Sequence, residues 1–367
     1  MFDYTKISQN EIALSLQRDL ERNELPQALL FSGPPFTGKL TAGVELAKAI
    51  GCNKENLVIS ATRDFLYPLN TALKVFMKSK TQKSKDFLKS NLEVFQFTFH
   101  SVLDVGNDKT KAQMFKVNEL ISTLNSLKDE DVSSWGKALN ETLLNVQKTR
   151  RKNNSLSMEQ LRAVQSWLEM TSFNNVPKVF ILEGIEDVNI NVANGLLKLL
   201  EEPNINARII LISTSYLKLL ETILSRVRKY DFKEITGKNL EDIVNSFSEN
   251  KVSYKNLESY FLLNGINNGL KIEKMAIDFI VERNFDLGNL FRFITKEKCE
   301  NIFLKQLSNS NEKLFLNGKM SLYQSQKLQR MIDLCYKNYN IYNQNIRTSL
   351  QALYYQINKD EDNEKIY

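Results

Sequence analysis

The sequence predicts an α/β protein in which a parallel β-sheet is followed by helical domains. Four-residue apolar runs at Ala28–Phe31, Val179–Leu182 and Ile209–Ile212 are of the kind that is buried on both faces of a parallel sheet. Segments with the apolar spacing of amphipathic helices separate these runs, and this alternation is typical of parallel α/β architecture. From Lys233 onward only helical periodicities follow.

Length and composition exclude several classes of protein. The 367 residues exceed a single domain, since one domain usually takes roughly 100–200 residues. A chain that is 42% hydrophobic and 25% charged is neither disordered nor collagen-like. No apolar run approaches the ~20 residues of a membrane-spanning helix, and the polar segment Met1–Glu11 has no apolar core of a secretory signal. We therefore expect a soluble, cytoplasmic protein with no membrane partner.

The metal-ligating residue types are few and scattered. Cys52, Cys299 and Cys335 lie far apart, as expected in a reducing compartment. The single histidine, His100, cannot build a histidine-based metal site alone. We therefore expect neither zinc nor another metal site. The net charge of +6 permits nucleic acid as a partner without demonstrating it.

The first part of the chain predicts a helix, a strand, a turn and a second helix. Glu11–Glu24 places apolar residues among charged ones and is followed by Pro26. The strand Ala28–Phe31 then leads through a Gly/Pro-rich turn into the helical pattern of Thr41–Ile50. This order of strand, loop and helix is the one in which phosphate-binding loops occur.

Residues of about 53–155 form an insertion within this first domain. Val94–Val105 alternates apolar and polar residues and predicts a strand. The lysine-rich stretch Lys78–Lys89 is interpreted as a solvated face, with contact to nucleic acid as the alternative. Regular structure resumes with helices at Met158–Met170 and Asn191–Glu202, and a last short strand is expected at 230–232.

Residues 33–39 match the first seven positions of a P-loop. The residues in order are Gly33, Pro34, Pro35, Phe36, Thr37, Gly38 and Lys39. Glycines let the backbone turn sharply and present its N–H groups to phosphate, while the lysine and the start of the next helix add positive charge. The next position should carry a Ser or Thr hydroxyl for Mg²⁺, but it is Leu40, and Thr41 follows one residue late, rotated by about 100° on a helix.

The second acidic motif of such a site is also altered. Strand Val179–Leu182 leads into Glu183, which takes the place of a metal-binding aspartate, and into Gly184, where a catalytic carboxylate is expected. Glu186 and Asp187 follow and offer a replacement, although a solvated helix start is the favoured interpretation of both. The expected consequence is a site with weak or absent ATP hydrolysis.

Several segments together resemble bacterial clamp-loader subunits of DNA polymerase III. The opening Leu25-Pro26-Gln27-Ala28-Leu29-Leu30-Phe31-Ser32-Gly33-Pro34 is similar to theirs, and Asn194-Gly195-Leu196-Leu197-Lys198-Leu199-Leu200-Glu201-Glu202-Pro203 resembles their Asn-Ala-Leu-Leu-Lys-x-Leu-Glu-Glu-Pro helix. Thr222-Ile223-Leu224-Ser225-Arg226-Val227 resembles the segment that carries their Ser-Arg-Cys motif. These matches cover about a third of the chain.

The resemblance implies an AAA+ α/β domain at 1–232, a helical lid at 233–285 and a helical oligomerisation domain, or collar, at 286–367. It implies that Arg226 is an arginine finger that reaches ATP on a neighbouring subunit, as in the delta-prime type, whose own ATP site is commonly degraded. Thr214 takes the place of the family's first sensor of the γ-phosphate, with helix capping as the alternative. The family's four-cysteine zinc module is missing.

The resemblance further implies partners and a role in DNA replication. The partners are the gamma/tau-like and delta-like subunits of a hetero-oligomer and, indirectly, the sliding clamp and primed DNA. In this role the chain is a stator whose own loop binds ATP weakly or not at all. One alternative is an active gamma/tau-like motor that uses Lys39 and Glu183, and another is a stand-alone P-loop kinase or repair ATPase in which Arg226 has no role.

Overall fold

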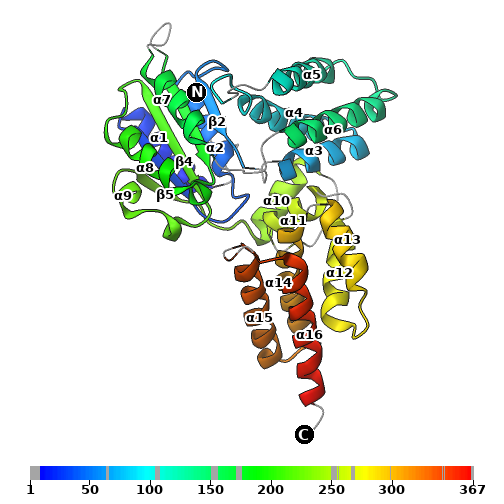
Figure 1. Ribbon diagram of the computed structural model, residues 1–367. Helices are drawn as coiled ribbons and strands as arrows, with labels where there is room; N and C mark the ends of the chain where they lie inside the picture. The colour runs from blue at the N-terminus through cyan, green and yellow to red at the C-terminus, as the bar shows by residue number, and fades with distance from the viewer. Residues whose placement is uncertain are drawn as a thin grey trace. The chain divides into compact units, whose positions relative to one another are not determined.

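The computed structural model divides into two compact units, Met1–Phe261 and Leu262–Tyr367 (Figure 1). The structure describes residues 9–364 except 63–65, 104–107, 150–155, 171–175, 249–253, 255, 266–268, 298, 341 and 343. Within these residues no helix is both long and apolar enough to cross a membrane. The predicted boundaries at 232 and 285 separate an α/β domain, a lid and an oligomerisation domain. They stay predictions, because they divide the chain by function and not by compactness.

The first unit is built on a parallel sheet of five strands, which confirms the predicted fold class. The strands are β1 (Ala28–Ser32), β2 (Leu57–Ser60), β3 (Lys178–Glu183), β4 (Ala207–Ser213) and β5 (Arg228–Asp231), and their order in the sheet is β2-β3-β4-β1-β5. β1 therefore lies between β4 and the edge strand β5, so Leu29 pairs with Ile210 on one side and Arg228 on the other.

Helices cover both faces of this sheet because alternate side chains of the strands point to opposite faces. Leu29 and Phe31 pack with α1 (Asn10–Glu21) and α2 (Lys39–Ala49). Ala28 and Leu30 pack on the other face. That face is covered by α7 (Met158–Glu169), α8 (Ile190–Glu201) and α9 (Glu221–Leu224), and the short 3₁₀ turns η4 (Ile185–Asp187) and η5 (Tyr216–Lys218) follow β3 and β4.

The regular structure described between β2 and α7 is helical. It contains α3 (Leu66–Ser79), α4 (Gln82–Phe97), α5 (Asp108–Leu124) and α6 (Val132–Thr149), drawn in blue-green in Figure 1. The strand predicted at Val94–Val105 is wrong, because α4 continues to Phe97. Leu92 and Phe95 of α4 enter the core of these helices, while Val94 and Phe97 pack toward the sheet. Because two sides of this helix are buried, its apolar residues follow one another at the short spacing that is typical of a strand.

Among the described residues after β5, all regular elements are helices, as predicted. They are α10 (Gly237–Phe247), α11 (Leu257–Gly265), α12 (Gly269–Val281), α13 (Leu287–Glu297), α14 (Glu300–Leu316), α15 (Leu322–Asn340) and α16 (Ile346–Glu364). In the second unit α12 packs against α14 and α16. Phe279 of α12 contacts both Phe303 and Tyr354, with ring centroids 5.8 and 5.3 Å away. These rings are the centre of that unit's core.

Candidate functional site

The predicted phosphate loop follows the carboxyl end of β1, the edge at which open α/β sheets bind their ligands. Gly33 has a φ of 143°, and a Cβ built on it would lie 2.0 Å from the carbonyl oxygen of Phe232. Gly38 has a φ of 86° and directly precedes α2, whose first residue is Lys39. Glycine is therefore required at both turns, at Gly33 by close approach as well as by conformation.

The Lys39 ammonium is bound by the loop itself. Its Nζ donates to the carbonyl oxygen of Gly33 at 2.6 Å, to that of Pro34, and to Oγ1 of Thr37 at 3.2 Å. An ammonium has three protons, so these three acceptors match its full donor capacity. Lys39 is 5% exposed, and burial lowers its pKa to about 8, against the opposing effect of nearby carboxylates, foremost Glu183.

The residues after Lys39 suit packing more than metal ligation. Leu40 packs against apolar residues of the sheet core and of the α3–α6 core. Thr41, the next hydroxyl, is one residue further along α2. The loop and the start of α2 therefore fit a phosphate group, whereas the position that holds Mg²⁺ in a P-loop carries no oxygen.

Glu183 ends β3 and is tied to the loop after β2. Its Oε2 accepts hydrogen bonds from the backbone N–H of Thr62 at 2.8 Å and from Oγ1 of Thr62 at 3.0 Å. Gly184 has a φ of 71°, and a Cβ built on it would lie 2.6 Å from Cγ2 of Thr62. A catalytic carboxylate at position 184 would thus require both a strained backbone and a displaced Thr62.

Thr214 is bound by a carboxylate that sequence reasoning placed in solvent. The backbone N–H of Thr214 donates to Oε1 of Glu186 at 2.7 Å, and the Thr214 hydroxyl donates to the same oxygen. The other oxygen of Glu186 is buried, with no hydrogen-bond partner among the residues that the structure describes. The solvated interpretation is therefore wrong for Glu186, while Asp187 is exposed as expected.

Glu186 was missed because its position depends on strand order. It follows β3, Thr214 follows β4, and these strands are neighbours in the sheet, so their carboxyl ends meet. Glu186 also raises the pKa of the Lys39 ammonium, which places its charge near the phosphate loop. The carboxyl ends of β1, β3 and β4 thus bring together Lys39, Glu183, Glu186 and Thr214.

Arg226 lies at the opposite end of the strands, the amino end. It precedes β5, which runs parallel to β1, whereas Gly33 follows β1, so the two residues belong to opposite ends of paired strands. Its guanidinium contacts Oε1 of Glu201 at 2.7 Å and donates to the carbonyl oxygen of Thr222 at 2.8 Å. A third of the side chain, 33%, is exposed. Two of the segments that carry the resemblance, at 194–203 and 222–227, are therefore in contact through this ion pair.

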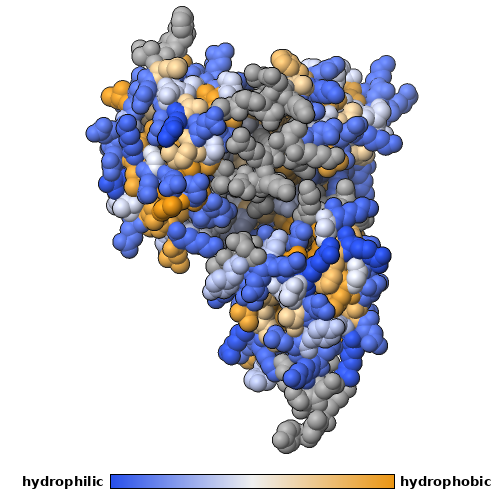
Figure 2. All heavy atoms as spheres, in the orientation of Figure 1, coloured by the Kyte–Doolittle hydropathy of each residue, from blue (hydrophilic) through white to orange (hydrophobic). Residues whose placement is uncertain are grey.

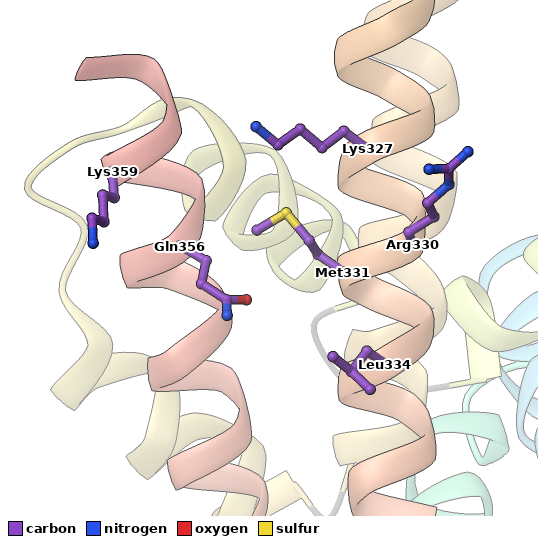
Figure 3. Close-up of a pocket in the computed structure, with 6 residues that line it drawn as sticks. All are labelled: Lys327, Arg330, Met331, Leu334, Gln356 and Lys359. Atoms are coloured by element: carbon purple, nitrogen blue, oxygen red, sulfur yellow. The ribbon is translucent and has the colours of Figure 1, made fainter. Parts of the chain in front are cut away.

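A separate groove lies in the second unit, between α15 and α16 (Figure 3). α15 contributes Lys327, Arg330, Met331 and Leu334, and α16 contributes Gln356 and Lys359. Its rim is basic and Met331 points into it in Figure 3. None of the site residues predicted from the sequence lines this groove.

A glycine-kinked loop between a buried parallel strand and a helix, with acidic side chains at the ends of neighbouring strands, defines the first unit as a P-loop-type α/β domain. The family model described as DNA polymerase III, delta subunit, matches residues 80–236. This match includes α4, α5 and α6, which sequence reasoning placed in an insertion.

Two curated relatives are delta-prime subunits of DNA polymerase III. That of Bacillus subtilis is 34% identical over 88 residues, which is 24% of this chain and 27% of the relative. That of Pseudomonas aeruginosa is 39% identical over 71 residues, which is 19% of this chain and 22% of the relative.

The tau subunit of DNA polymerase III from Bacillus subtilis is 24% identical over 231 residues, which is 63% of this chain and 29% of the relative. The chain thus spans less than a third of the length of each of these relatives. A solved structure of a gamma-subunit-related protein from Thermotoga maritima is 18% identical, with a TM-score of 0.37, over 61% of this chain and 89% of the other. The sequence matches make this chain a relative of DNA polymerase III clamp-loader subunits.

Proposed function

We propose that this chain is a delta-prime-like stator of a clamp loader, which supplies Arg226 to an ATP site on a neighbouring subunit. The observation that carries the proposal is the position of Arg226 at the amino end of the edge strand, away from the chain's own phosphate loop. An arginine in that position can serve a neighbouring subunit more readily than its own. Its planar, permanently charged guanidinium suits the negative charge that develops on a transferred phosphoryl group.

The ion pair with Glu201 supports this role of Arg226. A carboxylate that holds the guanidinium at 2.7 Å restricts the rotamers of a long side chain. Positioning of this kind reduces the entropy that must be lost when the arginine contacts phosphate. Because the pair is partly exposed, the attraction is screened by water and can be exchanged for a phosphate at small cost.

The chain's own loop supports weak or absent ATP binding. The donor capacity of Lys39 is matched by acceptors of its own loop. Leu40 leaves Mg²⁺ without its hydroxyl, and Gly184 leaves the site without the usual carboxylate. ATP that binds here without Mg²⁺ would be held mainly by the loop N–H groups and the start of α2.

The partners we propose are gamma/tau-like and delta-like subunits of a hetero-oligomer that acts on a sliding clamp at primed DNA. Exposed apolar side chains on α15 and α16 of the second unit offer contacts for such an assembly. They include Leu322, Tyr323 and Leu334 on α15 and Tyr355 on α16. Figure 2 shows apolar residues at several places on the visible face of this part of the chain.

The test is Arg226→Ala in the full chain, mixed with the partner subunits, clamp and primed DNA. The assembly should form at normal affinity, while its ATPase and clamp-loading rates fall, with ~10³-fold as the lower range for arginine fingers. Arg228→Ala is the matched control, because Arg228 is two residues further along, at the start of β5, and pairs with Asp19 of its own chain at 3.2 Å. Unchanged rates with Arg226→Ala would refute the proposal.

The second candidate is an active gamma/tau-like motor. Two observations favour it: the tau match covers more of this chain than either delta-prime match, and Glu186 places a carboxylate near Lys39 and Thr214. An ATPase assay on the purified chain with Mg²⁺ decides between the two. Turnover that disappears in Lys39→Ala would establish the motor, whereas the stator has no activity for this substitution to remove.

A further inference from the structure

The groove between α15 and α16 combines positive charge with apolar surface. Its volume is about 400 Å³. The lining side chains of each helix recur at the spacing of one helix face, so the groove is formed by the facing sides of two helices. Among the described residues no carboxylate lines it. The lining residues are Lys327, Arg330, Met331 and Leu334 on α15 and Gln356 and Lys359 on α16.

The charged and apolar side chains lie toward different ends of this groove. Figure 3 shows the three cations, Lys327, Arg330 and Lys359, toward one end and Leu334 toward the other, with Met331 pointing into the groove between them. Leu334 is 53% exposed, so part of this apolar surface is uncovered. From Lys327 to Leu334 the helix rises by about 10 Å, which is two turns. A partner therefore needs negative charge and apolar side chains separated by about two helical turns.

An amphipathic helix with acidic residues in its first turn has this arrangement. A helix that lies in a groove presents apolar residues one and two turns apart on a single face. Carboxylates are favoured in the first turn of a helix, because its N-terminus carries a partial positive charge. The acidic end of such a helix would meet the three cations, while its next two turns would meet Met331 and Leu334.

The charge of the groove favours a reversible partner over a permanent subunit contact. Three of the six lining side chains are cationic, whereas the cores of permanent interfaces are depleted of charged residues. Cations at an accessible site instead speed association with a partner of opposite charge and exclude others. Apolar side chains that do not line the groove, such as Tyr323 and Tyr355, are 67% and 60% exposed and stay available for assembly.

We propose that the α15–α16 groove is a docking site for an acidic amphipathic helix of a protein outside the clamp-loader ring. The carboxylates of its first turn pair with Lys327, Arg330 and Lys359, and its apolar residues cover Met331 and Leu334. The inference goes beyond the proposed function, because the site uses neither Arg226 nor the phosphate loop.

Fluorescence anisotropy of a synthetic peptide tests this site on the full chain. The probe has about 14 residues, a length at which an isolated helix is only marginally stable. It carries glutamates in its first turn, leucines one and two turns later, alanine and glutamine elsewhere, and fluorescein at its C-terminus. Binding should saturate and weaken as salt is added. A second probe of the same composition, with its glutamates in the last turn, should bind at least about fivefold more weakly.

Two substitutions separate the charge from the apolar surface. Arg330→Glu should weaken binding about tenfold and remove most of its salt dependence, because it reverses a charge. Met331→Gln should weaken binding about threefold and leave the salt dependence unchanged, because it alters only the apolar surface. Lys319→Glu is the control, since Lys319 is exposed between α14 and α15 and does not line the groove. Circular dichroism confirms that each variant is folded.

Equal binding of the first probe by the natural chain and by Arg330→Glu, or equal binding of the two probes, would overturn the proposal. The assembly with its partner subunits should bind the first probe as tightly as the separate chain. Loss of binding on assembly would make the groove a subunit contact and overturn a partner outside the ring. Self-association that Met331→Gln abolishes would make a second copy the occupant, with the same consequence. Arg226→Ala should bind the probe normally, so failure of the stator role and failure of this site are distinguishable.

Discussion

Replacing Lys39 with methionine should remove a rise in stability that the natural chain shows as the pH increases. Burial lowers the pKa of Lys39 from 10.5 to about 8 in the folded chain. In the unfolded chain the solvated amine keeps a pKa of about 10.4. Below pH 8 both states carry the proton, so the folded state bears the full cost of burying the charge. That cost corresponds to about 3 kcal/mol, at ~1.36 kcal/mol for each pH unit between 10.5 and 8.

Between about pH 8 and 10.5 the folded chain loses this proton while the unfolded chain keeps it. The unfolded state then binds more protons, so the free energy of unfolding rises with pH through this window. From about pH 7 to about pH 9.5 the rise that Lys39 contributes is about 2 kcal/mol. Methionine keeps an unbranched side chain without the charge. The difference in unfolding free energy between the two chains should therefore change by that amount.

Urea unfolding followed by tryptophan fluorescence measures this difference. Trp135 and Trp167 both belong to the unit that contains Lys39, so their emission reports the correct unit. The loss of hydrogen bonds in Lys39→Met lowers the free energy of unfolding equally at both pH values. This loss therefore cancels when the change with pH is compared between the two chains. Lys78→Met, at an exposed lysine of α3, is the control and should show no such change. A difference between the natural and Lys39→Met chains that stays constant with pH would refute a buried ammonium.

Three further predictions concern other residues. Gly38→Ala should cost about 1–2 kcal/mol of stability from its left-handed backbone alone. Gly33→Ala should prevent correct folding of the loop, because its Cβ would lie 2.0 Å from a carbonyl oxygen. Thermal unfolding of the two variants compares the cost of backbone strain with the cost of steric overlap. Glu201→Gln should lower the ATPase of the reconstituted assembly less than Arg226→Ala does, and an equal or larger loss would show that Glu201 is more than a positioning residue. Cys52, whose pKa burial raises to about 12, should resist iodoacetamide at about pH 8 until urea unfolds the chain, and mass spectrometry detects the modification.

The sheet could be predicted from local signals because β1, β3 and β4 are buried on both faces. Runs such as Val179–Leu182 are apolar without interruption, and proline or glycine follows or precedes them. The glycine loop was visible for the same reason, since its conformation is required within a few residues. By contrast α4 was missed, because Val94 and Phe97 on one side and Leu92 and Phe95 on the other all find apolar partners.

Contacts between distant segments left no comparable signal in the sequence. Glu186 meets Thr214 because β3 and β4 are neighbours, which depends on the order of strands in the sheet. The ring of Phe261 contacts those of Phe36 and Phe87, whose spacing in the chain follows no local period. Arg226 was identified by its motif, yet its ion pair with Glu201 depends on how α8 packs beside the start of β5.

Under the proposed function, the two ends of the strands explain how one chain can retain an arginine finger and lose its own catalytic site. Residues of the phosphate loop follow β1, whereas Arg226 precedes the paired strand β5, so their side chains share no contact among the interactions of the described residues. Substitutions at sites without shared partners act almost independently. Leu40 and Gly184 can therefore disable metal binding and water activation at one end without disturbing Arg226 at the other. Under the proposed function, selection for assembly and for Arg226 would leave the phosphate loop free to become a structural element.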